Sequence, residues 1–124
     1  MPLDLGKIII IVGPRRAGKT FYLFQLMDGL KKSGVSSQEI LYINFEDERL
    51  DLEGENDLIF DAYRELYPTQ DLSRVYLFLD EIQELPDWEK FVRRVMDTIS
   101  RRIVVTGSNS RLLSKEIATS LRGR

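Results

Sequence analysis

The sequence predicts an α/β fold in which a parallel β-sheet is covered by helices on both faces. Short apolar runs alternate along the chain with longer segments of helical periodicity, in the order β-α-β-α-β-α-β-α. The expected strands read as continuous apolar runs, which is typical of strands buried on both faces of a sheet. Ligands of such sheets bind at the carboxyl ends of the strands, and polar motifs follow the strand ends here.

The first half of the chain contains two expected strands, one helix and an acidic loop. Lys7–Val12 predicts a buried strand, because five β-branched residues run up to a Gly-Pro pair. Gly18–Lys32 predicts a helix, since its apolar residues recur near helical spacing and Ser33-Gly34 follows. Ile40–Phe45 predicts the second strand, and the acidic stretch Glu46–Asp57 predicts a solvated loop.

The second half continues the alternation. Asp57–Tyr67 predicts a helix that a proline ends, and Arg74–Leu79 predicts the third strand. A helix is expected from Asp87 to about Ser100, with its first aspartate as the N-cap. Arg102–Thr106 predicts the fourth strand, and Ser110–Ser120 predicts a last, shorter helix.

Composition excludes several classes of function. The 124 residues suggest one domain, and 43% hydrophobic with 31% charged residues is ordinary for a soluble globular protein. A net charge of −2 favours neither a nucleic-acid surface nor a membrane surface. The chain has no Cys and no His, which removes disulfides, histidine bases and most zinc sites. With no long apolar run and no signal-peptide pattern, a cytoplasmic location is expected.

A phosphate-binding loop follows the first expected strand. The motif G-x-x-x-x-G-K-[ST] is matched by Gly13, Pro14, Arg15, Arg16, Ala17, Gly18, Lys19 and Thr20. Gly13 and Gly18 let the backbone turn its N–H groups toward an anion, and Lys19 adds a charge for the β- and γ-phosphates. The Thr20 hydroxyl is a candidate Mg²⁺ ligand, and the next residue, Phe21, is a further candidate nucleotide contact. The arginines of the loop either touch phosphate or are solvated loop charges.

An acidic pair follows the third expected strand. Asp80 is predicted to hold Mg²⁺, mostly through its water shell, and Glu81 to act as general base on the attacking water. The alternative is that the pair only caps the next element. No Asn-Lys-x-Asp guanine reader occurs, and Gln83 stands where a D-x-x-G switch needs glycine. ATP is therefore the expected nucleotide. The acids in Asn44–Asp47 either assist the site or are plain loop acids.

Small polar residues end the fourth strand, and arginines end the chain. Thr106, Ser108 and Asn109 are candidate sensors of the γ-phosphate, although such residues also cap helices. Arg122 and Arg124 could neutralise transition-state charge from a neighbouring subunit. Alternatively they form a basic helix C-terminus, which the helix dipole favours.

Together these motifs resemble a known family, the archaeal and bacterial ATPases of the AAA-type superfamily, whose ATPase core often precedes a separate C-terminal domain. The segments that carry the resemblance are Gly13–Thr20, Phe45–Leu50, Leu79–Gln83, Pro86–Glu89, Thr106–Ser110 and Leu121–Arg124. The resemblance implies a three-layer α/β/α P-loop NTPase fold with strand order 5-1-4-3-2. It also implies that Glu81 is the catalyst and that Arg122 and Arg124 stand where related ATPases carry arginine fingers.

One departure from the family concerns the end of the chain. Family members continue into a fifth strand and a C-terminal domain, so residues 1–124 are expected to be a P-loop ATPase domain truncated before its last strand. The first strand would then lie at an edge of the sheet. Because a flat apolar edge invites pairing with another chain, self-association or low stability is expected.

Three functions fit these motifs. The first is Mg²⁺-dependent ATP binding and hydrolysis that drives or gates a C-terminal domain. The second is an ATP-dependent switch or interaction module with negligible turnover. The third is a DNA-processing or DNA-loading ATPase subunit, which no basic stripe, zinc module or helix-turn-helix supports.

Overall fold

The computed structural model describes residues 9–13, 18–47 and 58–108, and the secondary structure of these ranges alternates as expected. The strands are β1 (Ile9–Val12), β2 (Ile40–Asn44), β3 (Tyr76–Asp80) and β4 (Ile103–Gly107). The α-helices are α1 (Lys19–Lys32), α2 (Leu58–Leu66) and α3 (Trp88–Thr98). Short 3-10 turns lie at η1 (Ser37–Glu39), η2 (Leu72–Arg74) and η3 (Ile82–Glu84). The last expected helix lies outside the described residues.

The strands form one parallel sheet in the order β1-β4-β3-β2. This confirms the α/β class, and it reproduces the 1-4-3-2 part of the order that the family resemblance implies. The register pairs Val12 with Gly107 and Asn44 with Asp80. The carboxyl ends of all four strands therefore meet at the same edge of the sheet, and the residues after them are brought together.

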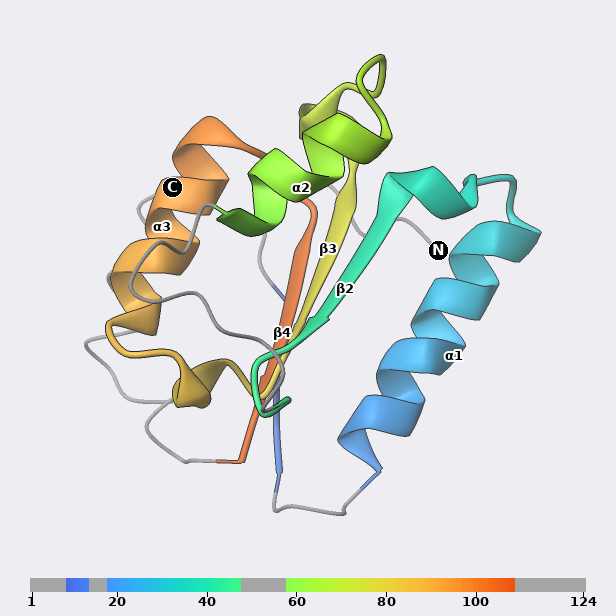
Figure 1. Ribbon diagram of the computed structural model, residues 1–124. Helices are drawn as coiled ribbons and strands as arrows, with labels where there is room; N and C mark the ends of the chain where they lie inside the picture. The colour runs from blue at the N-terminus through green and yellow to red at the C-terminus, as the bar shows by residue number, and fades with distance from the viewer. Residues whose placement is uncertain (1–8, 14–17, 48–57, 109–124) are drawn as a thin grey trace.

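Helices cover both faces of this sheet: α1 lies on one side, and α2 and α3 lie on the other (Figure 1). The α1 side is sealed by Leu23, Met27 and Leu30, which pack against Tyr76, Phe78 and Val104. The intervening β3 residues, Leu77 and Leu79, belong to the core under α2 and α3. Because successive strand residues point to opposite faces, a strand covered on both faces must be apolar throughout.

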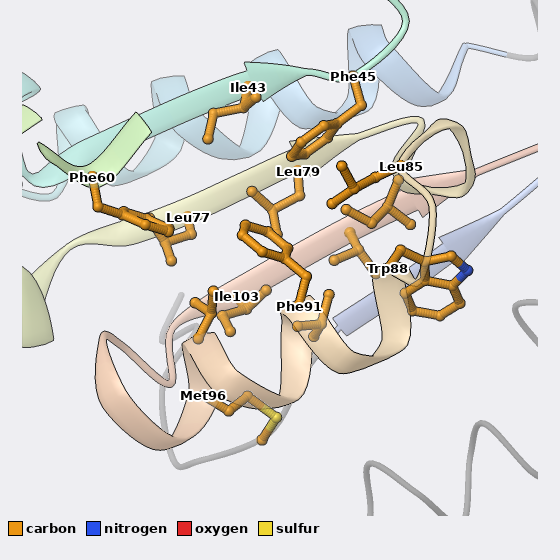
Figure 2. Packing of buried hydrophobic residues seen from close by; sticks show 14 of the residues in the cluster. Ile43, Phe45, Phe60, Leu77, Leu79, Leu85, Trp88, Phe91, Met96 and Ile103 are labelled. Carbon is orange, nitrogen blue, oxygen red and sulfur yellow. The ribbon is translucent and has the colours of Figure 1, made fainter. Parts of the chain in front are cut away.

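The larger core lies between the sheet and the pair α2–α3 (Figure 2). Phe91 of α3 is at its centre, with a ring stacked on Phe60 at 6.2 Å and edge-on to Phe45 at 6.1 Å. Phe60 comes from α2 and Phe45 directly follows β2, so these rings join three elements that are distant in the sequence.

One expected strand start and one expected capping contact need correction. Strand β3 begins at Tyr76, not Arg74, because Asp71 accepts the backbone N–H of Ser73 at 2.9 Å and starts the turn η2 there. Asp87 does stand at the N-cap of α3, but its φ is 57° and its side chain makes no cap hydrogen bond. An N-cap side chain reaches the first helical amides from extended backbone, which Asp87 does not have.

Strand β1 lies at an edge of the described sheet. It pairs with β4, and all four of its residues are half-buried. Self-association through this strand stays a prediction. Among the helices of the described ranges, none combines the length and the apolar character that crossing a membrane requires.

Candidate functional site

The candidate site lies at the carboxyl edge of the sheet, where the ends of β1, β3 and β4 meet the start of α1. Gly13 follows β1, and its N–H donates to the Gly107 carbonyl at 3.2 Å. Gly18 precedes α1 with a φ of 86°, in the left-handed region that glycine tolerates without strain. Its carbonyl accepts the first helical hydrogen bond, from Tyr22 N–H at 2.9 Å. Residues 14–17, the middle of the predicted loop, lie outside the described residues.

Lys19 points into the site from the first turn of α1, and only 6% of it is exposed. Its Nζ donates to the Gly13 carbonyl at 2.7 Å and to Ser108 Oγ at 3.1 Å. The same ammonium lies 3.7 Å from Glu81 Oε2. A buried cation is stable only with such partners, so three segments converge on one positive charge.

Asp80 ends β3 and is 1% exposed. Its Oδ2 accepts hydrogen bonds from the Thr20 hydroxyl at 2.8 Å and from the Tyr42 hydroxyl at 2.6 Å, and its Oδ1 accepts one from the Thr106 hydroxyl. Three hydroxyl donors thus satisfy the hydrogen-bonding capacity of this buried side chain.

The oxygen atoms of Asp80 and Thr20 are suitable ligands for a magnesium ion. The described residues hold no cluster of three or more His, Asp or Glu side chains that could bind a metal by themselves. Mg²⁺ beside a nucleotide does not need one, since one or two protein oxygens, waters and phosphate oxygens complete its octahedron. The Thr20 hydroxyl and the Asp80 carboxylate are adjacent hard oxygens of the required kind.

Glu81 is held in an unusual backbone conformation, with a φ of 54°. Its N–H donates to Thr106 Oγ1 at 3.0 Å. Its Oε1 accepts from Ser108 Oγ at 2.8 Å and from Gln83 Nε2 at 2.9 Å. Non-glycine residues in this region cost about 1–3 kcal/mol and are concentrated at functional sites.

The two described sensor candidates occupy different positions. Thr106 is fully buried, and its hydroxyl bridges Asp80 and the backbone of Glu81. The Ser108 hydroxyl instead lies between Lys19 and Glu81. Asn109 lies outside the described residues. A contact of either described hydroxyl with phosphate stays a prediction.

The remaining predicted site residues lie partly within the described ranges. Phe21 is 66% exposed on α1. Asn44 Oδ1 accepts the Glu46 N–H at 2.9 Å, and its carbonyl accepts the Asp47 N–H at 3.2 Å, so this segment forms a turn after β2. Arg122 and Arg124 lie outside the described residues.

Sequence reasoning missed two residues of the site, Tyr42 and Gln83. Tyr42 lies among apolar residues of β2, where a tyrosine is expected to contribute to packing. The signal for a role in the site is that a buried phenol needs a hydrogen-bond partner. Burial first, then the hydrogen bond to Asp80 and the charges of Asp80 and Glu81, raise the pKa of Tyr42 above its ordinary value. The phenol therefore stays protonated and donates to Asp80.

Replacing Tyr42 with phenylalanine is expected to destabilise the domain by about 1.5–3 kcal/mol, because a buried carboxylate loses one of its donors. Urea unfolding would measure the change, with Tyr22→Phe on the exposed side of α1 as the matched control. Equal unfolding midpoints for wild type and Tyr42→Phe would contradict the role of this hydroxyl.

The fold and the site together define a class of protein. A lysine-threonine pair at a strand-to-helix junction faces an aspartate-glutamate pair at the end of another strand, on a parallel sheet of order β1-β4-β3-β2. This is a P-loop NTPase-like α/β protein.

A comparison with known protein families places the chain more narrowly than this class does. The family described as "AAA domain" matches residues 5–124, and the chain belongs to this family. Membership indicates a nucleotide-binding, ATPase-like function. The chain is 48% identical over 121 residues to an uncharacterized protein of Methanocaldococcus jannaschii, covering 96% of this chain and 25% of that protein. It is 37% identical over 121 residues to an uncharacterized protein of Haemophilus influenzae, covering 98% of this chain and 30% of that protein. The chain thus spans less than a third of the length of these relatives.

Proposed function

We propose that the chain binds Mg-ATP and hydrolyses it to ADP and phosphate. One observation carries the proposal: the Lys19 ammonium lies 3.7 Å from Glu81 Oε2, and the neighbouring Thr20 hydroxyl donates to the buried Asp80 carboxylate at 2.8 Å. These side chains supply a phosphate-binding cation, hard oxygen ligands and a carboxylate base. P-loop hydrolysis needs the same three functions.

Each residue has a distinct role in the proposed reaction. The Lys19 ammonium exchanges its contacts with Ser108 and Glu81 for the β- and γ-phosphate oxygens. Thr20 and Asp80 would hold Mg²⁺, which supplies neutralisation of the charge that develops on the phosphates. The Glu81 carboxylate takes a proton from a water molecule as the water oxygen attacks the γ-phosphorus. The bond to the bridging oxygen of ADP breaks, and the electron pair leaves with ADP.

A second function, a switch with negligible turnover, is supported by the contact between Lys19 and Glu81. These two groups are 6% and 8% exposed and 3.7 Å apart, so each partly neutralises the other. A protein in which this contact persists with nucleotide bound would bind ATP without activating water. Single-turnover kinetics separate the two functions, because only the ATPase converts bound ATP to ADP.

The nucleotide-binding part is tested by thermal unfolding with and without Mg-ATP. A ligand at about a hundred times its dissociation constant adds roughly 2.7 kcal/mol, which raises the midpoint of a domain of this size by several degrees. Lys19→Ala is expected to abolish this rise. Lys32→Ala, at the exposed end of the same helix, should keep it.

An unchanged midpoint of the wild-type chain in Mg-ATP would refute nucleotide binding by this chain. An equal rise in Lys19→Ala would refute the role given to the lysine. Mg-GTP in place of Mg-ATP tests the preference for adenine that the missing guanine reader predicts.

A further inference from the structure

The side chain of Gln83 bridges two parts of the site that follow different strands, Glu81 after β3 and Ser108 after β4. Its Nε2 donates to Glu81 Oε1 at 2.9 Å, and its Oε1 accepts the backbone N–H of Ser108 at 3.2 Å. The Nε2 also lies 3.4 Å from Glu84 Oε2. Since the donor end faces a carboxylate and the acceptor end faces an N–H, the network defines the orientation of the amide.

The bridge determines which carboxylate oxygen of Glu81 is available to accept a proton from water. Oε1 accepts from both Gln83 Nε2 and Ser108 Oγ, whereas Oε2 is the oxygen that lies 3.7 Å from the Lys19 ammonium. Lys19 marks the phosphate position in the proposed function. Oε2 is therefore the oxygen directed toward the place where the attacking water must lie.

The local backbone makes this reach possible. Glu81 has a φ of 54°, and its carbonyl accepts the Glu84 N–H at 3.1 Å as the turn η3 begins. Gln83 lies within this turn, two residues after the carboxylate that it contacts. The bond to Ser108 then ties the turn to the end of β4, 25 residues away in the sequence.

We propose that Gln83 is a positioning residue for ATP hydrolysis, which holds the Glu81 carboxylate with Oε2 facing the phosphate site. The inference rests on the proposed function. Within the described part of the chain, the Gln83 side chain bonds to Glu81, Glu84 and the Ser108 N–H, and not to Lys19 or Asp80, the side chains proposed to hold the nucleotide and Mg²⁺. Its loss should therefore change the chemical step more than binding. A misplacement of about 1 Å in a reacting group can cost on the order of 10²-fold in rate.

Two variants separate the ends of the bridge. Gln83→Met removes both hydrogen bonds at similar volume, and we expect kcat to fall by about 10–100-fold with KM for ATP unchanged. Gln83→Glu keeps an acceptor for the Ser108 N–H but loses the donor to Glu81, so kcat should fall at least as far. Gln70→Glu, the same change at a site bonded to Gln38, should leave kcat unchanged. Thermal midpoints without nucleotide verify that each variant folds.

The outcomes distinguish this inference from the proposed function. Suppose that the wild-type chain hydrolyses ATP, that Glu81→Gln does not, and that both Gln83 variants keep the full rate. This result would overturn the positioning role and leave the proposed function standing. A rise in KM with unchanged kcat would also overturn it, because Gln83 would then act in binding. If kcat falls in Gln83→Met but stays at the wild-type value in Gln83→Glu, the bond to the Ser108 N–H and not the bond to Glu81 affects the rate. That result would contradict the proposal. A wild-type chain that shows no turnover would overturn hydrolysis and the positioning role together, and the thermal shift with Mg-ATP would show separately whether binding survives.

Discussion

Glu81→Gln is expected to lower the rate of ATP hydrolysis by about 10²–10⁴-fold, because an amide cannot take the proton of the attacking water. Glutamine has the same size and keeps an oxygen that can accept from Ser108 Oγ and Gln83 Nε2. The site should therefore stay assembled. ATP binding should persist or strengthen, since Lys19 loses a competing negative charge 3.7 Å away.

The measurement is phosphate release at saturating Mg-ATP, together with the thermal midpoint of the same samples. Glu65→Gln on the exposed side of α2 is the matched control, with the same chemical change outside the site. Undiminished hydrolysis by Glu81→Gln would rule out this residue as the base. Loss of the Mg-ATP thermal shift in the variant would mean that Glu81 acts in binding.

Phe91→Ala should destabilise the domain by about 3–5 kcal/mol, a large part of the stability of an ordinary domain. The ring is 1% exposed and contacts Phe45 after β2 and Phe60 of α2, so its removal leaves a cavity between three elements. All three elements contribute side chains to this core (Figure 2).

Chemical denaturation would measure this loss, with Phe21→Ala as the control that removes the same atoms from a side chain 66% exposed. The control should change stability by no more than about 0.5 kcal/mol. Similar losses for the two variants would contradict the assignment of Phe91 to the centre of the core.

Local patterns in the sequence were sufficient for much of the fold and for part of the candidate site. The phosphate-loop motif is eight consecutive residues, and the Asp80-Glu81 pair directly follows an apolar strand, so both are visible without any long-range contact. The burial of residues 76–79 in β3 and 103–105 in β4 likewise follows from their continuous apolar character. Roles in nucleotide chemistry for Glu81, Thr106 and Ser108 remain predictions.

Other features depended on neighbours distant along the chain. Asp87 carries the residue type of an N-cap, yet the buried side chains of Leu85 and Trp88 on either side anchor the chain in the core. The backbone between them turns into the left-handed region, and the side chain loses its capping geometry. Local propensity was overridden here by tertiary packing.

The sequence by itself determined the alternation of strands and helices, the phosphate-loop motif and the carboxylate pair, because each is encoded in adjacent residues. Only the tertiary structure decided which side chains surround those carboxylates. Tyr42 reaches Asp80 across 38 positions, and Ser108 reaches Glu81 across 27, through the pairing of β3 with its neighbours β2 and β4. Strand order and register place these groups together, and both arise from the packing of the whole sheet between its helices, not from any local pattern.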